Sequence, residues 1–115
     1  MADLVAYKVL TAAQLAELEH HGVFAGEPVD LADGYIHMST AAQLDQTVTK
    51  HFGGQHDLTV AAVDLEALGD AVRWEPSRGG QLFPHLYGTL SLDSLIAYGP
   101  LEREDDGAIR LPTAG

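Results

Sequence analysis

The chain has 115 residues, of which 46% are hydrophobic and 20% charged, a composition typical of one soluble globular domain. Its net charge of −11 argues against general nucleic-acid binding and against anionic membranes, because such a surface repels both. The chain has no cysteine, which excludes disulfides, thiolate metal sites and cysteine nucleophiles. No signal-peptide pattern or membrane-length apolar run is present, so we expect a cytoplasmic protein.

The first half of the chain predicts strands followed by capped helices. Residues 4–10 predict a strand, and "TAAQL" after it predicts a helix that Thr11 caps, with Gln14 as the capping-box partner. Residues 23–33 predict a loop, because glycine, proline and aspartate interrupt them. Residues 34–38 predict a second strand, and a second "TAAQL" begins a helix that ends at the glycine pair 53–54.

The second half predicts mostly strands. Residues 57–64 are apolar on both faces and predict a central strand. Pro84 predicts that "FPHLYGTL" lies at a sheet edge or a bulge. The other predicted elements are a helical turn at "LEALG", a strand at 72–75 broken by Pro76, a glycine-hinged loop at 77–82, a turn at "SLDSL" and a last strand at "LIAYGPL".

This order predicts an α+β fold with a bent, split, mixed or antiparallel sheet and two helices near the N-terminus. We expect a single domain over residues 1–102 and a polar tail over residues 103–115. The tail is expected to be loose unless Ile109 and Leu111 anchor it.

The segment "GYIHMST" carries the first candidate site. In a strand, Tyr35 and His37 share one face and the other face is core. Ser39 and Thr40 begin the next helix, where free N–H groups favour anions. The alternative is a surface histidine followed by two ordinary helix caps.

The segment "RWEPSRGGQLFPHLYG" carries the second candidate site. Arg78 lies between Ser77 and two glycines, where a guanidinium suits phosphate or carboxylate. Phe83, His85 and Tyr87 share a face in an extended chain, and two rings around a histidine form a slot for a flat group. The alternatives are a solvated loop arginine and an aromatic core stripe with a hydrogen-bonded histidine.

A metal site is not predicted. Histidines 51 and 56 are candidate ligands together with His37 or His85, but the chain has no HExxH or comparable spacing.

The order "YKVL", "DGYIHMSTAAQL", "HFGGQHDL", "VDLEAL", "RWEPSRGGQLFPHLYG" resembles the bacterial family of domain of unknown function 952, from about residue 6 to residue 100. That family resembles the ADP-ribosyltransferase fold, and RNA 2′-phosphotransferase-like members most, with "YIHMST" matching their histidine strand at His37 and Ser39. The resemblance implies that a split sheet clamps NAD. It further implies that His37 contacts the nicotinamide ribose, Arg78 a phosphate and Tyr87 the nicotinamide, with His85 as the reactive-centre candidate.

The leading functional prediction is therefore a small protein that binds NAD or another phosphorylated nucleotide in a His/Arg/aromatic cleft. NAD is expected as a substrate for ADP-ribosyl or phospho transfer, through an oxocarbenium-like ribose held by Arg78 and the histidines. Two alternatives stay open. One is a non-catalytic ligand-binding module, and the other is a hydrolase or isomerase that uses His37 and His85 as acid and base.

Overall fold

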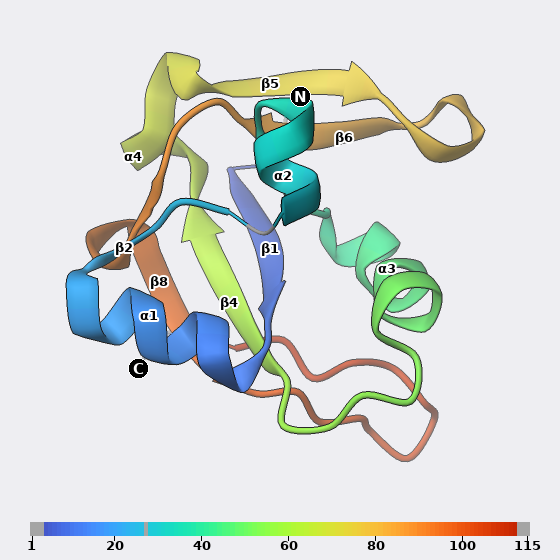
Figure 1. Ribbon diagram of the computed structural model, residues 1–115. Coiled ribbons are helices and arrows are strands. Elements are labelled where there is room, and N and C mark those ends of the chain that lie inside the picture. Colours follow the sequence, from blue (N-terminus) through green and yellow to red (C-terminus); the bar gives the residue numbers. More distant parts are fainter. Residues whose placement is uncertain (1–3, 27, 113–115) are drawn as a thin grey trace.

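The computed structural model describes residues 4–26 and 28–112, apart from the side chains of residues 28, 29 and 78. Its largest sheet has the order β1-β4-β8 and is antiparallel throughout. The central strand β4 (Thr59–Asp64) has five buried residues in six, because β1 (Val5–Leu10) and β8 (Leu95–Pro100) flank it (Figure 1). The prediction of a central strand in this segment is confirmed.

Two capped helices follow the first and third strands. Helix α1 (Ala12–His21) and helix α3 (Ala41–Phe52) each begin with a complete capping box, made by Thr11 with Gln14 and by Thr40 with Gln43. Gly22 ends α1 in a left-handed conformation with φ +77°, which glycine adopts without strain. No helix in the part of the chain that the structure describes is long and apolar enough to cross a membrane.

A second antiparallel sheet has the order β3-β6-β5 and carries much of the site. Its strands are β3 (Ile36–His37), β6 (Leu82–Leu86) and β5 (Val72–Pro76). The expectation that Pro84 marks an edge or a bulge is wrong, because β6 is the central strand. Proline is tolerated there because β3 spans only two residues, and beyond its end the Pro84 carbonyl accepts a bond from the Met38 N–H at 3.1 Å.

Residues 23–33 were expected as a loop, and the structure corrects this. They contain strand β2 (Val23–Phe24) and helix α2 (Pro28–Asp33). Both elements are too short to show a period in the sequence. Gly26 permits the connection between them: its φ is +121°, and a Cβ there would lie 2.8 Å from the Cβ of Asp30. The chain thus passes directly against a buried aspartate.

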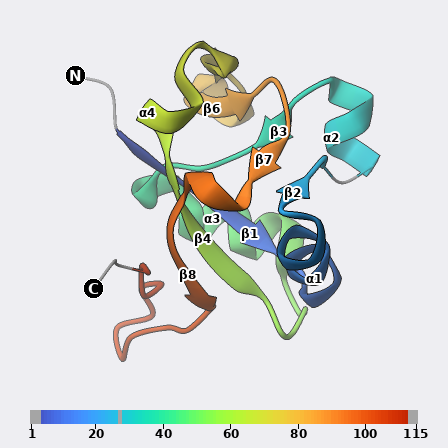
Figure 2. The same cartoon turned by 90° about the vertical axis from the view of Figure 1, so that its left-hand side faces the viewer.

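Short elements complete the domain. Strand β7 (Leu90–Ser91) pairs with β2, and this pair lies between the two larger sheets (Figures 1 and 2). The predicted turn at "LEALG" is helix α4 (Leu65–Leu68), and three single 3₁₀ turns follow at Gly69–Ala71, Arg78–Gly80 and Leu92–Ser94.

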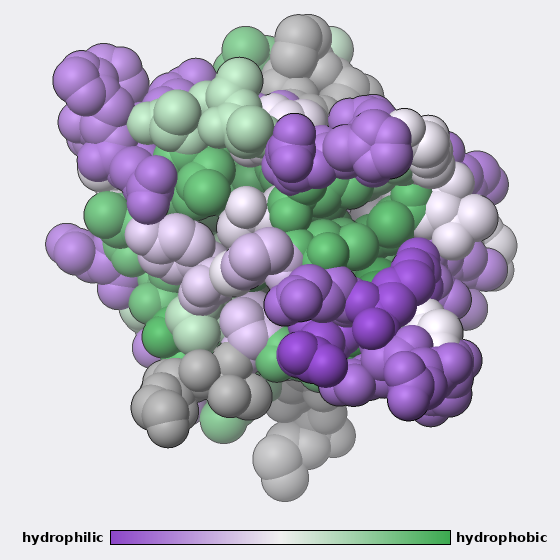
Figure 3. Space-filling model, turned by 90° about the horizontal axis from the view of Figure 1, so that it is seen from below, coloured by the Kyte–Doolittle hydropathy of each residue, from purple (hydrophilic) through white to green (hydrophobic). Residues whose placement is uncertain are grey.

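The described residues form two apolar clusters in the interior. The larger cluster packs α1, β2, β3 and β7 against the sheets around Phe24, Ile36 and Leu86. The second lies between α3 and the main sheet, and Ile109 and Leu111 of the tail pack against it. Ile109 and Leu111 therefore anchor the tail. Seen from below, hydrophobic surface lies between hydrophilic patches (Figure 3).

Candidate functional site

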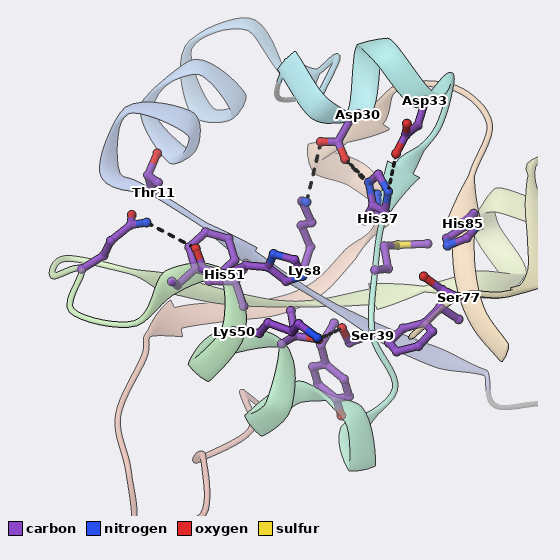
Figure 4. Close-up of a pocket in the computed structure, with 17 residues that line it drawn as sticks. Lys8, Thr11, Asp30, Asp33, His37, Ser39, Lys50, His51, Ser77 and His85 are labelled. Carbon is purple, nitrogen blue, oxygen red and sulfur yellow. Dashed lines mark hydrogen bonds and ion pairs between the residues drawn. The ribbon is translucent and has the colours of Figure 1, made fainter. Parts of the chain in front are cut away.

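A pocket of about 570 Å³ lies between α2 and α3, beside β1 and β6 (Figure 4). This volume is in the range of small-molecule sites. Its polar lining comes from six separate segments, and the residues are Lys8, Thr11, Asp30, Asp33, His37, Ser39, Thr47, Lys50, His51, Gln55, Ser77 and His85. The apolar part of the lining includes Val9, Met38, Phe52 and Phe83.

The pocket concentrates the cationic side chains of an acidic protein. Both lysines of the chain, Lys8 and Lys50, line it, together with three of the six histidines. In contrast, Arg103 and Arg110 form ion pairs with exposed carboxylates elsewhere. The two aspartates of the lining balance the two lysines, so the pocket is neutral before any histidine is protonated, whereas the whole chain carries −11.

Asp30 is a buried carboxylate of α2 that contacts two other lining residues of the pocket. Its side chain is 2% exposed, and its Oδ2 lies 3.8 Å from Nζ of Lys8, which is also buried. Its Oδ1 accepts the backbone N–H of His37 at 3.1 Å and lies 2.5 Å from Nδ1 of the same histidine. The Asp30 carboxylate on α2 therefore positions both the Lys8 amine of β1 and the His37 imidazole of β3.

His37 is held between two carboxylates. Its Nδ1 faces Asp30, and its Nε2 lies 3.0 Å from Oδ2 of Asp33, one turn further along α2. Both carboxylates accept only, so an imidazolium, which donates from both nitrogens, satisfies both contacts. Asp33 is 43% exposed, whereas Asp30 is buried, so the two contacts differ in their access to solvent.

His85 lies on β6 directly across from His37 and has one carboxylate partner among the described residues. It is 2% exposed, and its Nδ1 lies 2.9 Å from Oε1 of Glu75 on the neighbouring strand. The hydroxyl of Tyr87 donates to the same Oε1 at 2.7 Å. These two hydrogen bonds, that from His85 first, lower the pKa of Glu75, and the bond to Glu75 raises the pKa of Tyr87.

Tyr35 connects the two histidines. Its ring stacks on His85 with the centroids 4.0 Å apart, and it contacts the ring of His37 at 4.7 Å. The rings of His37 and His85 are 5.5 Å apart. Desolvation by its surroundings is the largest cause that raises the pKa of Tyr35. Tyr35 therefore covers one face of the His85 ring.

The predicted site residues fall into two groups. His37, Ser39, Phe83 and His85 line the pocket. The others stand outside its lining: Tyr35 lies behind the histidines, Thr40 caps α3, and Tyr87 is 37% exposed, with the Arg73 guanidinium 4.8 Å from its ring centre. The side chain of Arg78 lies outside the described residues, so its predicted anion contact stays a prediction.

Several residues of the site escaped the sequence analysis. Asp30 and Asp33 fell in the segment expected as a loop, and their spacing of three residues gains meaning only in α2. Glu75 shares a strand face with Arg73, so the sequence offers it a closer partner, but its carboxylate bonds His85 across the sheet. Lys8 offered one signal, since it is a charge inside an otherwise apolar strand.

The histidines considered above as metal ligands do not form a metal site among the described residues. Among the residues that the structure describes, no group of three or more histidine, aspartate or glutamate side chains has an arrangement that could hold a metal ion. His51 lines the pocket.

A second, more open hollow of about 490 Å³ adjoins the pocket. Lys50 lines both, and the rest of its lining is uncharged: Gln46, Thr49, Gly79 and Gln81. The two hollows therefore share a cation at their junction.

Replacing Tyr87 with phenylalanine is expected to raise the pKa of Glu75 toward the ordinary glutamate value, because one of its two stabilising hydrogen bonds is lost. A lowered pKa in the folded state means that Glu75 contributes stability above its ordinary pKa, and that this contribution disappears as pH falls through the lowered value. A carboxyl ¹³C titration by NMR measures the shift. Tyr98→Phe, which removes the bond to Glu19, is the control and leaves the Glu75 titration unchanged.

Comparison with known proteins places the chain in a family. A family model described as protein of unknown function (DUF952) matches residues 9–98. The crystal structure of protein CC0527 from Caulobacter crescentus is 40% identical, with a TM-score of 0.83 over 92% of this chain and 93% of that one. The solution NMR structure of CC0527 is also 40% identical, with a TM-score of 0.78 over 93% and 91%. The curated proteins contain no match. The chain therefore belongs to the DUF952 family.

Proposed function

We propose that the pocket binds a small phosphorylated ligand of the nucleotide class, with NAD as the leading candidate. The observation that carries the proposal is the gathering of both lysines and three histidines in one pocket of a chain with net charge −11. Cationic side chains that converge from separate segments of the chain can together bind an anionic ligand. Lysine is a common point-charge partner of phosphate.

The surroundings of Lys50 also support an anionic ligand. Lys50 is exposed and has no carboxylate partner among the described residues, so an anionic ligand would not have to displace one. It also stands between the two hollows. A two-part ligand with its phosphates at the junction, such as a dinucleotide, would place one polar group in each hollow.

The likeness of the histidine strand to ADP-ribosyltransferase and RNA 2′-phosphotransferase-like proteins favours NAD among the phosphorylated ligands. In this arrangement His37 orients the ribose hydroxyls. The anion partner is Lys50, since Lys8 is paired with the buried Asp30. Arg78 stays the predicted source of a further contact.

Replacing Lys50 with glutamine is expected to weaken nucleotide binding by about tenfold or more, because a charge-assisted bond to phosphate is lost. Isothermal calorimetry with NAD, ADP-ribose and 2′-phosphorylated nucleotides measures the effect. Arg110→Gln, which changes an exposed ion pair of the tail, is the matched control with the same loss of charge. If none of these compounds releases heat with the unaltered protein, the proposal fails.

Catalysis is a second candidate function, favoured by the two imidazoles 5.5 Å apart that face different carboxylates. Histidines in different environments suit the roles of acid and base near neutral pH. Release of nicotinamide from NAD would identify a transferase or glycohydrolase, and binding without release would identify a ligand-binding module.

A further inference from the structure

His85 is a buried imidazole with one nitrogen engaged and one available. Its Nδ1 bonds Glu75, which does not line the pocket, whereas the ring itself does. Among the described residues, Nε2 has no hydrogen-bond partner. Figure 4 shows the ring at the edge of the pocket, turned toward the other lining side chains. Because Nε2 is nearly excluded from water, it requires a hydrogen-bond partner. A ligand in the pocket would supply that partner.

The partner of Nδ1 fixes which nitrogen carries the proton of the neutral ring. Glu75 accepts from Tyr87 as well as from His85, and both bonds favour the ionised carboxylate. A carboxylate has no proton to donate, so Nδ1 must be the protonated nitrogen. The stacked ring of Tyr35 holds the plane of the imidazole. Nε2 is then a hydrogen-bond acceptor that points away from Glu75.

We propose that Glu75 fixes His85 in the tautomer with a protonated Nδ1, and that the acceptor at Nε2 selects a hydroxyl group on the phosphorylated ligand. This inference rests on the proposed function and narrows it. The lysines of the pocket donate only, and an imidazolium at His37 does the same. An anionic group satisfies these donors but leaves Nε2 without a proton to accept.

The ligand class that satisfies both needs is a phosphate ester that carries a free hydroxyl, such as a sugar phosphate or a ribonucleotide. Inorganic phosphate and pyrophosphate lack the sugar hydroxyl that would reach Nε2 of His85. Glu75 is a positioning residue in this proposal, because it acts on the ligand through His85.

The tautomer is tested first, without any ligand. Long-range ¹H–¹⁵N NMR of the histidine rings above pH 8 is expected to show His85 with a protonated Nδ1 and an unprotonated Nε2. Glu75→Gln is expected to populate both tautomers, because an amide accepts or donates. Glu19→Gln, whose carboxylate accepts only from Tyr98 on another surface, is the control and leaves the His85 signals unchanged. A protonated Nε2 in the unaltered protein overturns the proposal, as does no change in Glu75→Gln.

The hydroxyl is tested second, by calorimetry with AMP, 2′,3′-dideoxy-AMP and inorganic phosphate. AMP is expected to bind about tenfold more tightly than the dideoxy compound, and Glu75→Gln is expected to reduce this ratio. Equal affinity for AMP and dideoxy-AMP overturns the hydroxyl selection and leaves the anion pocket standing. If no phosphorylated compound binds, the proposed function fails together with the hydroxyl selection, and the tautomer result alone then describes Glu75.

Discussion

Replacing Asp30 with alanine is expected to lower the free energy of unfolding by about 3–5 kcal/mol, the range for breaking a buried charge pair. The carboxylate is 2% exposed, lies 3.8 Å from the buried amine of Lys8 and accepts from His37. Its removal leaves the Lys8 ammonium without this counter-charge and the His37 backbone N–H without its acceptor. Urea unfolding followed by circular dichroism measures the loss.

Asp33→Ala is the matched control, since Asp33 lies on the same helix and contacts the same histidine. Its carboxylate is 43% exposed, so the expected loss is about 0–1 kcal/mol. Equal losses for the two variants would contradict the role of Asp30 as the buried anchor of α2, β1 and β3.

Phe24→Ala is expected to destabilise the protein by about 3–5 kcal/mol, through lost burial and a cavity in the larger cluster. Phe24 is 1% exposed, although it belongs to a strand of only two residues. It joins the β2–β7 pair to the apolar interior, so the effect should match that of an ordinary core aromatic. Thermal unfolding by calorimetry measures it.

The neighbouring Val23 provides the control for this change. Val23 is 42% exposed on the same strand, and its replacement by alanine should change stability by no more than about 0.5 kcal/mol. A small effect of Phe24→Ala would mean that the β2–β7 pair contributes little to the stability of the larger cluster.

Sequence patterns predicted the regular elements well where they were long enough to show a period. The two capped helices and the central strand β4 follow from local chemistry, and all are present. Strand β2, strand β7 and helix α2 escaped because two to six residues show no periodicity. Pro84 misled the prediction because a proline's tolerance depends on where the partner strand ends.

The candidate site was likewise predictable from the sequence only in part. Alternation in "GYIHM" and "FPHLY" predicted that His37 shares a face with Tyr35 and His85 a face with two rings, and both histidines line the pocket. The carboxylates that hold them were not predictable, since Asp30 needs the path at Gly26 and Glu75 reaches His85 diagonally across two strands. Side-chain pairs across a sheet depend on the register between the two strands, and the sequence of one strand alone does not determine that register.

Every strand before α3 pairs with a strand after it: β1 with β4, β2 with β7 and β3 with β6. During synthesis the first half of the chain therefore leaves the ribosome without the segments that complete its sheets. Loop closure over such separations is slow, and unpaired strand edges invite association with other chains meanwhile. The repeated capping boxes give the emerging chain two local helices, so α1 and α3 are the natural nuclei around which the later strands assemble.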